Sequence, residues 1–496
     1  MYDKFKDYTE PENFAKIVDY GTVGEMWAYV SKQFAQNTAI VYGEKTYTFA
    51  ELDSDVAHYR AFLLSQGVKK GDCVGMLLPN SYAFAKVFLA LTTLGAVAAV
   101  LPPQLPAEAV FGCAMKFGMK GLVYAPALAE KTAVLQKMNP SCLLLDSDAA
   151  FDGTAPAGEV LPKDPCAIMF TGGTSGKSKG ALLSHKAVMA GTRNGCYGVN
   201  PAFEQRYVLV LPLSHVFGLI RNLMTSLYSG SSILICQDTK DMFRDIAMFK
   251  PTIMVLVPAL AEMALTLSKQ FGRNMLGDDL KYIICGAAPV PQYLVREYHA
   301  MGVQMAPGYG LTESANLVSG NPDAMGHPDS VGIPYAGQEI KFVDGEIWLK
   351  GINMMESYVG EPEENAEAYE DGWFKTGDLG RLDEDGFLYI TGRKKAILVL
   401  QSGENVSPEE VEACFNAIDL VQDSLVYCDE NGALVLEVVP RRTEMAKVEG
   451  DAGKLLQEQI AQANSTLPSI KRVSRVVIRE EDFKRSPSMK ILRDQK

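Results

Sequence analysis

The sequence predicts an α/β fold in which helices cover both faces of a largely parallel sheet. Short apolar segments that suit strands alternate with longer segments of helical spacing, as at residues 72–78, 81–94 and 97–101. The same alternation returns at residues 121–145 and again at 207–257. Strands that are apolar throughout indicate burial on both faces, and their alternation with helices is typical of parallel sheets.

Size and composition indicate a soluble globular protein of more than one domain. The chain has 496 residues, whereas one domain typically has ~100–200. Hydrophobic residues make up 47% and charged residues 22% of the chain, which is enough to build a large core. The net charge of −13 argues against sequence-independent binding of nucleic acid, which requires a basic surface.

The cysteines and the apolar runs favour a cytoplasmic protein without a membrane span. Nine cysteines without a C-x-x-C pair, with only five histidines, suit reduced thiols and show no zinc-ligand spacing. The most apolar run, residues 85–101, is interrupted by Lys86 and Gly95 and is shorter than the ~20 apolar residues of a spanning helix. We also find no apolar signal core in the first residues.

The first segments of the chain read as a helix, a hairpin and a second helix. Residues 22–35 have helical apolar spacing, and residues 39–49 suit a hairpin. Thr48 is expected to cap the helix at residues 50–65, with Glu51 in its first turn.

A loop rich in Gly, Ser, Thr and Lys follows the apolar segment 167–170. Residues 171–180 read Thr-Gly-Gly-Thr-Ser-Gly-Lys-Ser-Lys-Gly. Glycines let the backbone approach an anion closely and turn its N–H groups inward, and the hydroxyls and lysines add donors and positive charge. The loop therefore predicts a site for the phosphates of a nucleotide. A surface loop without a ligand is the alternative that the loop alone leaves open.

The same loop fits the Walker A pattern G-x-x-x-x-G-K-[ST] of kinases and ATPases only in part. Gly176, Lys177 and Ser178 are in place, but Thr171 stands where the first Gly is required. We find no convincing second Mg²⁺ carboxylate after an apolar strand in the arrangement that such enzymes need. Both observations weigh against a P-loop phosphotransferase.

Further loops of small or polar residues follow predicted strands. Ligands of parallel sheets bind at the carboxyl ends of the strands, so we expect these loops to form one site together with residues 171–180. They are residues 212–218, with His215 at their centre; residues 286–289, Gly-Ala-Ala-Pro; and residues 307–314, Pro-Gly-Tyr-Gly-Leu-Thr-Glu-Ser.

The chain beyond residue 330 reads as a small β-rich unit followed by further alternation of strands and helices. Asp344-Gly345 and Asp385-Gly386 lie between apolar alternations and are hairpin signals. Ser407 is expected to cap a helix that begins at Pro408.

These segments together resemble the motifs of the acyl-adenylate-forming ligases, the superfamily of acyl-CoA synthetases, luciferases and peptide-synthetase adenylation domains. The loop at 171–180 resembles [ST]-[SG]-G-[ST]-[ST]-G-x-P-K-G, with Ser178 in place of Pro. The other matches are Y-T-[FY]-x-E-L at 47–52, L-P-x-x-H at 211–215, G-Y-G-x-T-E at 308–313, T-G-D at 376–378, G-R-x-K-[DEK] at 392–396, and [LI]-P-[RK]-[TS]-x-x-G-K-[IV]-x-R at 483–493. They follow the family order over nearly the whole chain.

The resemblance implies how the nucleotide is bound. The phosphates would contact Thr171, Gly172, Gly173, Thr174, Ser175, Gly176 and Lys179. The adenine would be bordered by Gly286, Ala287, Ala288, Pro289, Gly308, Tyr309 and Gly310, with the ring of Tyr309 against it. Asp378 would bind the ribose hydroxyls, since a carboxylate accepts two hydrogen bonds at once, and Arg393 would contact ribose or phosphate.

The resemblance also implies the catalytic residues. Lys490 aligns with the catalytic lysine, and Thr312 would donate a hydrogen bond to the α-phosphate. Glu313 would bind Mg²⁺, a hard cation that prefers carboxylate and phosphate oxygens. His215 would line the pocket of the substrate carboxylate, together with Val216, Phe217, Gly286 and Gly310.

The implied architecture is a large N-terminal domain of layered αβαβα sheets with a small β-rich unit, followed by a small mobile α+β domain. The boundary would separate residues 1–395 from residues 396–496. After rotation of the second domain, Ser402 and Gly403 would line a thiol tunnel. Ala396 stands where the hinge residue is usually Asp or Lys, and Met489 stands where Gly is usual.

The implied function is an AMP-forming carboxylic acid–CoA ligase that uses ATP, Mg²⁺ and coenzyme A. Two alternatives stay open: an enzyme that loads a carrier-protein phosphopantetheine, and a non-catalytic nucleotide-binding protein. No acidic residue is placed to hold a substrate ammonium group, which favours a simple organic acid over an amino acid. The sequence carries no signal of the oligomeric state.

Overall fold

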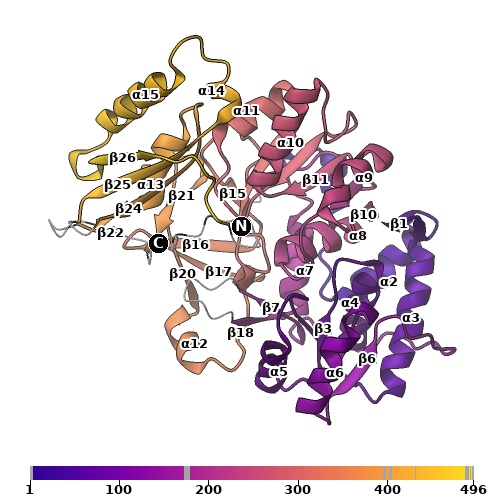
Figure 1. Ribbon diagram of the computed structural model, residues 1–496. Coiled ribbons are helices and arrows are strands. Elements are labelled where there is room, and N and C mark those ends of the chain that lie inside the picture. The colour runs from indigo at the N-terminus through magenta and orange to yellow at the C-terminus, as the bar shows by residue number, and fades with distance from the viewer. Residues whose placement is uncertain are drawn as a thin grey trace.

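The computed structural model describes residues 4–171, 179–394, 398–400, 405–429, 432–485, 491 and 493. They form a large N-terminal α/β part and a smaller C-terminal part, which confirms the predicted fold class. In Figure 1 the yellow C-terminal elements gather on one side, apart from the indigo and purple N-terminal helices.

A nine-stranded sheet occupies the middle of the large part. Its six central strands, β1, β10, β9, β11, β12 and β13, are parallel, while β2, β14 and β15 pair antiparallel at its ends. The strands across the sheet are β15 (Ile333–Pro334), β14 (Ser319–Gly320), β13 (Gln304–Tyr309), β12 (Tyr282–Cys285), β11 (Ile253–Leu256), β9 (Arg206–Leu209), β10 (Ser232–Ile235), β1 (Thr38–Tyr42) and β2 (Lys45–Thr48).

A second, seven-stranded sheet is also mostly parallel. Only β8 and β18 run antiparallel to their neighbours. The strands across the sheet are β18 (Ser357–Tyr358), β8 (Gly180–Ser184), β7 (Pro165–Phe170), β4 (Val97–Val100), β3 (Cys73–Leu77), β5 (Gly121–Tyr124) and β6 (Leu143–Asp146).

One continuous hydrophobic core joins the two sheets through the helices that pack on them.

The predicted capping box is confirmed at the start of α3, where Thr48 Oγ1 accepts from the Glu51 N–H (3.2 Å) and Glu51 accepts from the Thr48 N–H (2.7 Å). The helices of the large part are η1 (Lys4–Tyr8), α1 (Pro11–Phe14), α2 (Val23–Gln33), α3 (Phe49–Ser65), α4 (Tyr82–Leu94), α5 (Ala107–Lys116), α6 (Ala129–Met138), α7 (His185–Asn194), the π-helix η3 (Phe217–Met224), α8 (Thr225–Tyr228), α9 (Met242–Phe249), α10 (Pro258–Phe271), α11 (Gln292–Ala300), η5 (Thr312–Ser314) and α12 (Pro362–Ala368).

The predicted β-rich unit is an antiparallel five-stranded sheet. Both predicted turns are present: Asp344 and Gly345 have positive φ between β16 and β17, and Gly386 has positive φ between β20 and β21. The strands are β16 (Gln338–Val343), β17 (Glu346–Gly351), β19 (Tyr369–Glu370), β20 (Trp373–Leu382) and β21 (Leu388–Arg393).

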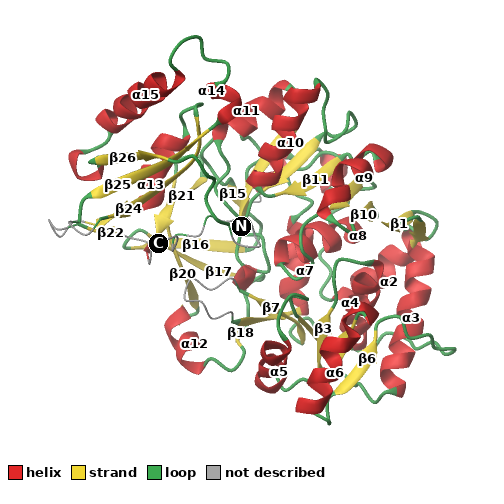
Figure 2. Ribbon diagram, viewed as in Figure 1, coloured by secondary structure: helices red, strands yellow, loops and turns green. Residues whose placement is uncertain are grey.

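The C-terminal part has a hydrophobic core of its own, made by residues between 398 and 473. Figure 2 shows its three-stranded sheet with α13 and α15 packed beside it. Its elements are β22 (Leu398–Val399), β23 (Asn405–Val406), α13 (Pro408–Asn416), β24 (Val421–Cys428), β25 (Leu434–Pro440), α14 (Arg442–Met445), α15 (Ala452–Thr466) and β26 (Arg475–Ile478).

The contacts that hold the C-terminal part against the large part include an arginine–aromatic contact, an ion pair and a hydrogen bond. The guanidinium of Arg441 lies 3.8 Å from the ring centroid of Tyr293 and 3.4 Å from Glu262 Oε1. Ser407 Oγ donates to the carbonyl of Thr391 (3.0 Å). The predicted side-chain cap at Ser407 is therefore wrong: α13 begins at Pro408 as expected, but the hydroxyl bonds to the neighbouring strand β21 instead.

None of the described helices is long and apolar enough to span a membrane.

Two helical glycines should respond oppositely to alanine. A Cβ at Gly191 in α7 would collide with the carbonyl oxygen of Ala315, whereas a Cβ at the exposed Gly112 in α5 would meet nothing within 4 Å. We expect Gly112→Ala to raise the free energy of unfolding by about 0.5–1 kcal/mol and Gly191→Ala to lower it by about 1–3 kcal/mol. Urea denaturation of both variants checks this, and equal effects at the two positions would contradict the packing described here.

Candidate active site

The predicted phosphate loop is closed at its base by the antiparallel pairing of β7 and β8. Phe170 pairs with Gly180, and the N–H of Thr171 donates to the carbonyl of Lys179 (2.9 Å). Both ends of the loop are thus held at the carboxyl end of β7. The predicted residues Gly172, Gly173, Thr174, Ser175 and Gly176 lie outside the described residues.

The two glycine-containing segments predicted beside adenine leave adjacent parallel strands. Cys285 at the end of β12 pairs with Pro307 in β13, so the segments 286–289 and 308–310 are neighbours. A Cβ on Gly286 would lie 3.0 Å from the carbonyl oxygen of Gly308 and 3.5 Å from the ring of Phe217. A Cβ on Gly310 would collide with the carbonyl oxygen of Asn316. A side chain is therefore excluded at Gly310 and has little room at Gly286.

Asp378 is a buried carboxylate, 2% exposed, at the centre of a hydrogen-bonded group. The hydroxyl of Tyr309 donates to Asp378 Oδ2 (2.6 Å), and Nε of Arg393 donates to Oδ1 (2.7 Å). Burial and the neighbouring Asp378 raise the pKa of Tyr309 well above its ordinary value, so its hydroxyl stays protonated and remains a donor. The three predicted nucleotide residues thus lie together, and the carboxylate keeps lone pairs for a further donor.

Glu313 lies in the short helix η5, directly after β13, and is fixed from a distant strand. The hydroxyl of Tyr358 in β18 donates to Glu313 Oε1 (2.6 Å), and the N–H of Met355 donates to the carbonyl of Glu313 (2.7 Å). Desolvation raises the pKa of Glu313, while the Tyr358 hydrogen bond and the charge of Arg393 lower it. Thr312, next to it, is buried, with 7% of its surface exposed.

Lys179, at the end of the phosphate loop, also contacts Tyr358, through the face of its ring. Its Nζ lies 5.0 Å from the centroid of the Tyr358 ring and forms an ion pair with Glu364 of α12. Tyr358 pairs with Ala181 in β8, two residues after Lys179. One side chain therefore contacts both the loop lysine and the carboxylate after β13.

His215 precedes the π-helix η3 in a loop that is tied to Asn80. Nδ1 of His215 accepts from the N–H of Phe217 (3.2 Å), so in the neutral ring the proton is on Nε2. Asn80 accepts from the N–H of Leu213 (2.8 Å) and donates to the carbonyl of Leu211 (2.8 Å). The loop is thereby fixed between β9 and η3.

The arrangement fits Mg²⁺ bound through substrate phosphates rather than by the protein alone. No group of three or more metal-ligating side chains occurs in the described part of the chain. Mg²⁺ typically takes one or two carboxylates and completes its shell with phosphate and water. A single fixed carboxylate, Glu313, near the base of a phosphate loop suits this mode.

Comparison with known families agrees with this geometry. The chain matches the family model "AMP-binding enzyme" over residues 27–359 and the model "AMP-binding enzyme C-terminal domain" over residues 395–496. The chain belongs to the AMP-binding enzyme family. The recognition of the acyl-adenylate-forming ligases is confirmed, as is the prediction of an enzyme of that class.

Curated relatives of this AMP-binding enzyme are CoA ligases. A long-chain-fatty-acid–CoA ligase, FadD13 of Mycobacterium tuberculosis, is 28% identical over 482 residues, which are 90% of this chain and 92% of the relative. The 4-coumarate–CoA ligase-like 3 protein of Oryza sativa subsp. japonica is 30% identical over 479 residues, which are 86% of this chain and 79% of the relative.

Solved structures show the same fold. The o-succinylbenzoate CoA synthetase of Bacillus subtilis, in complex with its acyl-adenylate OSB-AMP, has a TM-score of 0.79 at 24% identity and covers 95% of this chain and 97% of its own. The same synthetase has been solved with ATP and a magnesium ion. The anthranilate CoA ligase AuaEII, in complex with anthranoyl-AMP, has a TM-score of 0.84 at 21% identity and covers 96% of both chains.

Three further predicted residues of this AMP-binding enzyme, Lys490, Ser402 and Gly403, lie outside the described residues. Near Lys490 the structure describes Arg485, Ile491 and Arg493. Arg485 forms a β-bridge with Ile491. The guanidinium of Arg493 donates to Glu412 Oε2 (2.8 Å) and to Glu409 Oε1 (3.1 Å), both in α13. Arg493 is thus held on α13.

The sequence analysis missed Tyr358 and Glu364. Tyr358 stands in a two-residue strand, and Glu364 stands in an acidic run, Glu361 to Glu364, that reads as a solvated surface. Neither belongs to a motif or a periodic pattern in the sequence that marks it. Their partners, Glu313 and Lys179, lie 45 and 185 residues away.

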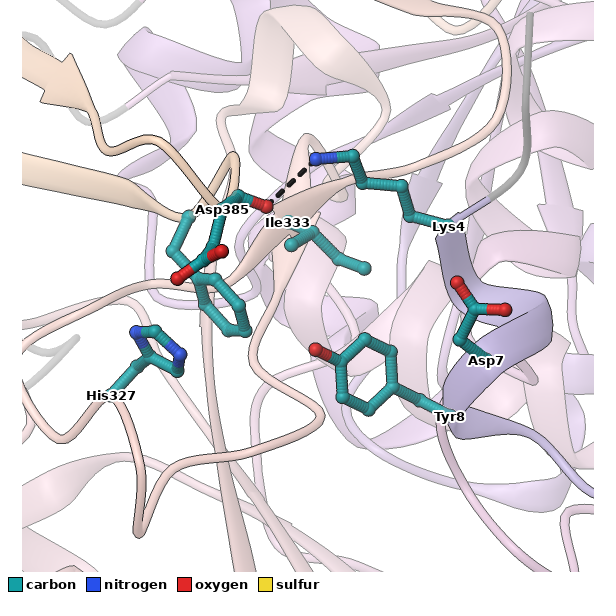
Figure 3. A pocket seen from close by; sticks show the side chains of 7 residues that line it. Lys4, Asp7, Tyr8, His327, Ile333 and Asp385 are labelled. Atoms are coloured by element: carbon teal, nitrogen blue, oxygen red, sulfur yellow. Dashed lines mark hydrogen bonds between the residues drawn. The ribbon is translucent and has the colours of Figure 1, made fainter.

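A cavity of about 310 Å³ lies elsewhere on the large part (Figure 3). It opens between the N-terminal helix η1 and the β20–β21 turn, and none of the predicted site residues lines it. Its lining residues are Lys4, Asp7, Tyr8, His327, Ile333, Asp385 and Phe387.

Replacing Glu313 by Gln should stabilise the ligand-free protein near neutral pH but not near pH 4.5. Desolvation raises the folded-state pKa of Glu313 above its ordinary value of 4.5, so the native state holds a proton that the unfolded state releases. The stability contributed by this proton is complete below the ordinary pKa and is lost as the pH rises through the folded-state pKa. Calorimetric melting temperatures of both proteins, from about pH 4.5 to about pH 8, check the expected divergence.

Tyr358→Phe serves as the companion variant, because it removes the hydroxyl that lowers the pKa of Glu313. The melting temperature of this variant should fall more steeply with rising pH than that of the unmodified protein. Parallel profiles, or no gain from Glu313→Gln at neutral pH, would count against the buried carboxylate described here.

Proposed function

We propose that the protein is an AMP-forming carboxylic acid–CoA ligase. The observation that carries the proposal is the chain of contacts from Lys179 through Tyr358 to Glu313, which joins the phosphate loop to a fixed carboxylate. The buried Asp378, which accepts from Tyr309 and Arg393, supports its proposed role as the partner of the ribose hydroxyls. The family membership and the CoA ligases among its relatives support the same activity.

In the first proposed step, a carboxylate oxygen of the acid attacks the α-phosphorus of ATP. The bond from that phosphorus to the pyrophosphate oxygen breaks, and acyl-AMP and pyrophosphate result. Negative charge grows on the α-phosphate, where Thr312 and Lys490 would donate hydrogen bonds. A magnesium ion held by Glu313 and the phosphates would offset further charge. The role of Asp378 is to hold the ribose and thereby orient the α-phosphate.

In the second proposed step, the sulfur of coenzyme A attacks the acyl carbon. The bond from that carbon to the AMP oxygen breaks, AMP leaves with the electron pair, and the thiol proton passes to solvent. Ser402 and Gly403 would border the incoming thiol. We place the domain boundary between residues 395 and 396, and the separate core of the C-terminal part supports a domain that turns between the two steps.

A carrier-protein thiol is the alternative acceptor. The basic residues Lys471, Arg472, Arg475 and Arg479 could meet either the phosphates of coenzyme A or an acidic carrier. In the structure, Lys471 pairs with Glu410 and Arg479 pairs with Glu437, which reduces the charge offered to either acceptor. The CoA ligases among the relatives favour coenzyme A.

The activity is tested by measuring pyrophosphate release with MgATP and a panel of carboxylic acids, with and without coenzyme A. We expect release that depends on one class of acid and that turns over repeatedly only when coenzyme A is present. Single-turnover release that coenzyme A does not affect would point to a carrier protein instead. ATP binding without release for any acid would contradict the proposed activity.

Lys490→Ala should separate the two steps. Because Lys490 would stabilise charge only on the α-phosphate, we expect acid-dependent pyrophosphate exchange to fall by roughly 100-fold or more. Thioester formation from supplied acyl-AMP should change little. Lys484→Ala, in the same basic segment, is the control and should affect neither rate. Equal losses in both steps of the Lys490 variant would refute its assignment.

A further inference from the structure

Arg221 is buried in the middle of the π-helix η3 without a counter-ion. Its side chain is 2% exposed, and its Nη1 has no hydrogen-bond partner. Among the described residues, no carboxylate lies within ion-pair distance of it. Arginine keeps its charge in proteins, and a buried charge without a partner is strongly unfavourable. The folded chain therefore retains a cation that it does not itself neutralise.

The other buried arginines of the described chain are all provided with acceptors. Arg60, Arg193 and Arg441 are 6%, 7% and 8% exposed, respectively, and each donates to an oxygen. Their acceptors are the carbonyl of Ala155 for Arg60 (3.0 Å), Asp19 Oδ1 for Arg193 (2.8 Å) and the carbonyl of Asp419 for Arg441 (2.7 Å). Nε of Arg193 and Nε of Arg441 are also without a hydrogen-bond partner, but each of these arginines has an oxygen acceptor elsewhere on its guanidinium. Arg221 differs from them in this respect among the described residues.

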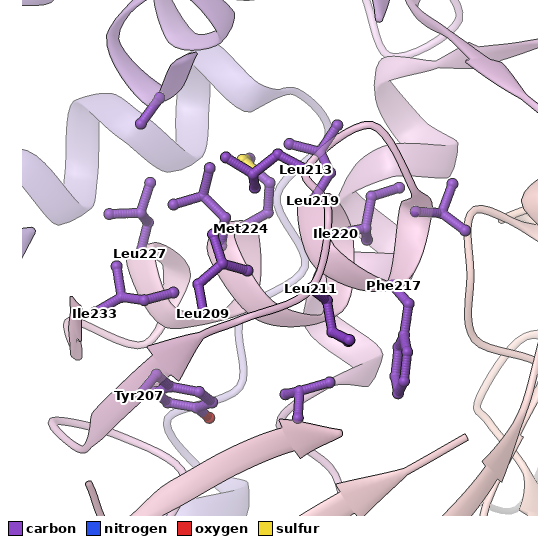
Figure 4. Packing of buried hydrophobic residues seen from close by; sticks show 14 of the residues in the cluster. Tyr207, Leu209, Leu211, Leu213, Phe217, Leu219, Ile220, Met224, Leu227 and Ile233 are labelled. Carbon is purple, nitrogen blue, oxygen red and sulfur yellow. The ribbon is translucent and has the colours of Figure 1, made fainter. Parts of the chain in front are cut away.

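The surroundings of Arg221 are polar although they are deeply buried. The side chains of Tyr207, Tyr335 and Cys196 lie within electrostatic range of its guanidinium. The hydroxyl of Tyr207, which Figure 4 shows on β9 below η3, has no hydrogen-bond partner of ordinary geometry. Burial raises the pKa of this tyrosine to about 12, although the charge of Arg221 and a hydrogen bond with Arg221 lower the pKa, so the hydroxyl stays protonated.

Further buried polar atoms without partners occur in η3 itself, in α7, which packs on η3, and next to Ala315, which faces Gly191 of α7. Oδ1 of Asn194 in α7, Oδ1 of Asn222 in η3 and Nδ2 of Asn316 are buried without partners. Most buried polar groups in folded proteins have partners, so such a concentration indicates a site that is completed by a bound molecule. We call Arg221, Tyr207, Asn194, Asn222 and Asn316 the Arg221 site.

The Arg221 site lies along the same helix as the predicted acid pocket. Phe217, at the start of η3, has its ring near Gly286 in the predicted nucleotide surface. Arg221 follows four residues later in the same π-helix. Ile220 and the carbonyl of Ala315 both face Gly191 of α7, which brings η3 next to the segment that follows Glu313. Wide helical turns of this π type are frequent at functional sites.

We propose that Arg221 binds a second negative group on the substrate acid, so that the preferred substrates are short dicarboxylic acids. One carboxylate would react at the α-phosphate, and the other would accept hydrogen bonds from the guanidinium, with the Tyr207 hydroxyl and the Asn316 amide as further donors. A planar guanidinium suits a carboxylate because it can donate two parallel hydrogen bonds. The inference rests on the proposed acid–CoA ligase function and names its substrate class.

The test compares matched acids that differ only in the second carboxylate. Pyrophosphate release is measured with succinate, glutarate and adipate and with butyrate, valerate and hexanoate. We expect kcat/KM for at least one dicarboxylate to exceed that of its matched monocarboxylate by about 100-fold, the usual size for a buried charge pair. In Arg221→Met this ratio should collapse, mainly through a higher KM for the dicarboxylate, while the KM for ATP stays the same.

Melting temperatures distinguish a substrate-binding role of Arg221 from a purely structural role. Because Arg221→Met removes an uncompensated buried charge, its melting temperature without ligand should equal or exceed that of the unmodified protein. Arg60→Met, which removes a buried arginine that has acceptors, should lower the melting temperature and leave the ratio unchanged. A lower melting temperature for Arg221→Met with an unchanged ratio would overturn the proposal.

Binding without turnover supplies an independent readout. The preferred dicarboxylate alone should raise the melting temperature of the unmodified protein but not that of Arg221→Met. Monocarboxylates that react as well as dicarboxylates would overturn the assignment of Arg221 and leave the ligase function standing. Pyrophosphate release with none of the acids would contradict the ligase function itself, and a thermal shift by dicarboxylates would then still locate an anion site at Arg221.

Discussion

The hydrogen bond from Tyr358 to Glu313 joins the two large sheets at the candidate site. Glu313 follows the last parallel strand of the nine-stranded sheet, and Tyr358 belongs to the edge strand of the seven-stranded sheet. The same ring lies under Lys179 at the base of the phosphate loop. Because each partner comes from a different rigid element, the distance between the loop and the carboxylate is set by the packing of the two sheets, not by local chain geometry.

The buried charged side chains of this site differ in how far other residues of the chain neutralise them. Asp378 is compensated within the chain, since Arg393 and Tyr309 both donate to it. Glu313 is only partly compensated, and desolvation raises its pKa. Arg221 has no compensating carboxylate among the described residues. These differences suit a site in which bound ligands supply the opposite charges. A cation would lie beside Glu313, and an anion would lie beside Arg221.

Much of the fold could be predicted because its signals are local. The apolar segments indicated parallel strands because helices on both faces of a sheet bury such segments. Thr48 caps a helix and the Asp-Gly pairs form turns through contacts within a few residues of themselves. The expected cap at Ser407 was wrong because a nearby strand, β21, competed for the hydroxyl. Of the site, the motif residues Tyr309, Glu313 and Asp378 were predictable, since a short string of residue types identifies them.

The sequence by itself determined the elements, the family motifs and hence the class of enzyme, because these depend on neighbours along the chain. Only the tertiary structure decided which side chains serve those motifs. Tyr358, Glu364 and Arg221 are ordinary residues in ordinary segments, and a lone arginine in a helix normally reaches solvent. Arg221 is surrounded by Tyr207, Tyr335 and Cys196, which come from other elements than its own helix. Desolvation and charge pairing depend on all the atoms around a group, and those neighbours exist only once the sheets have packed.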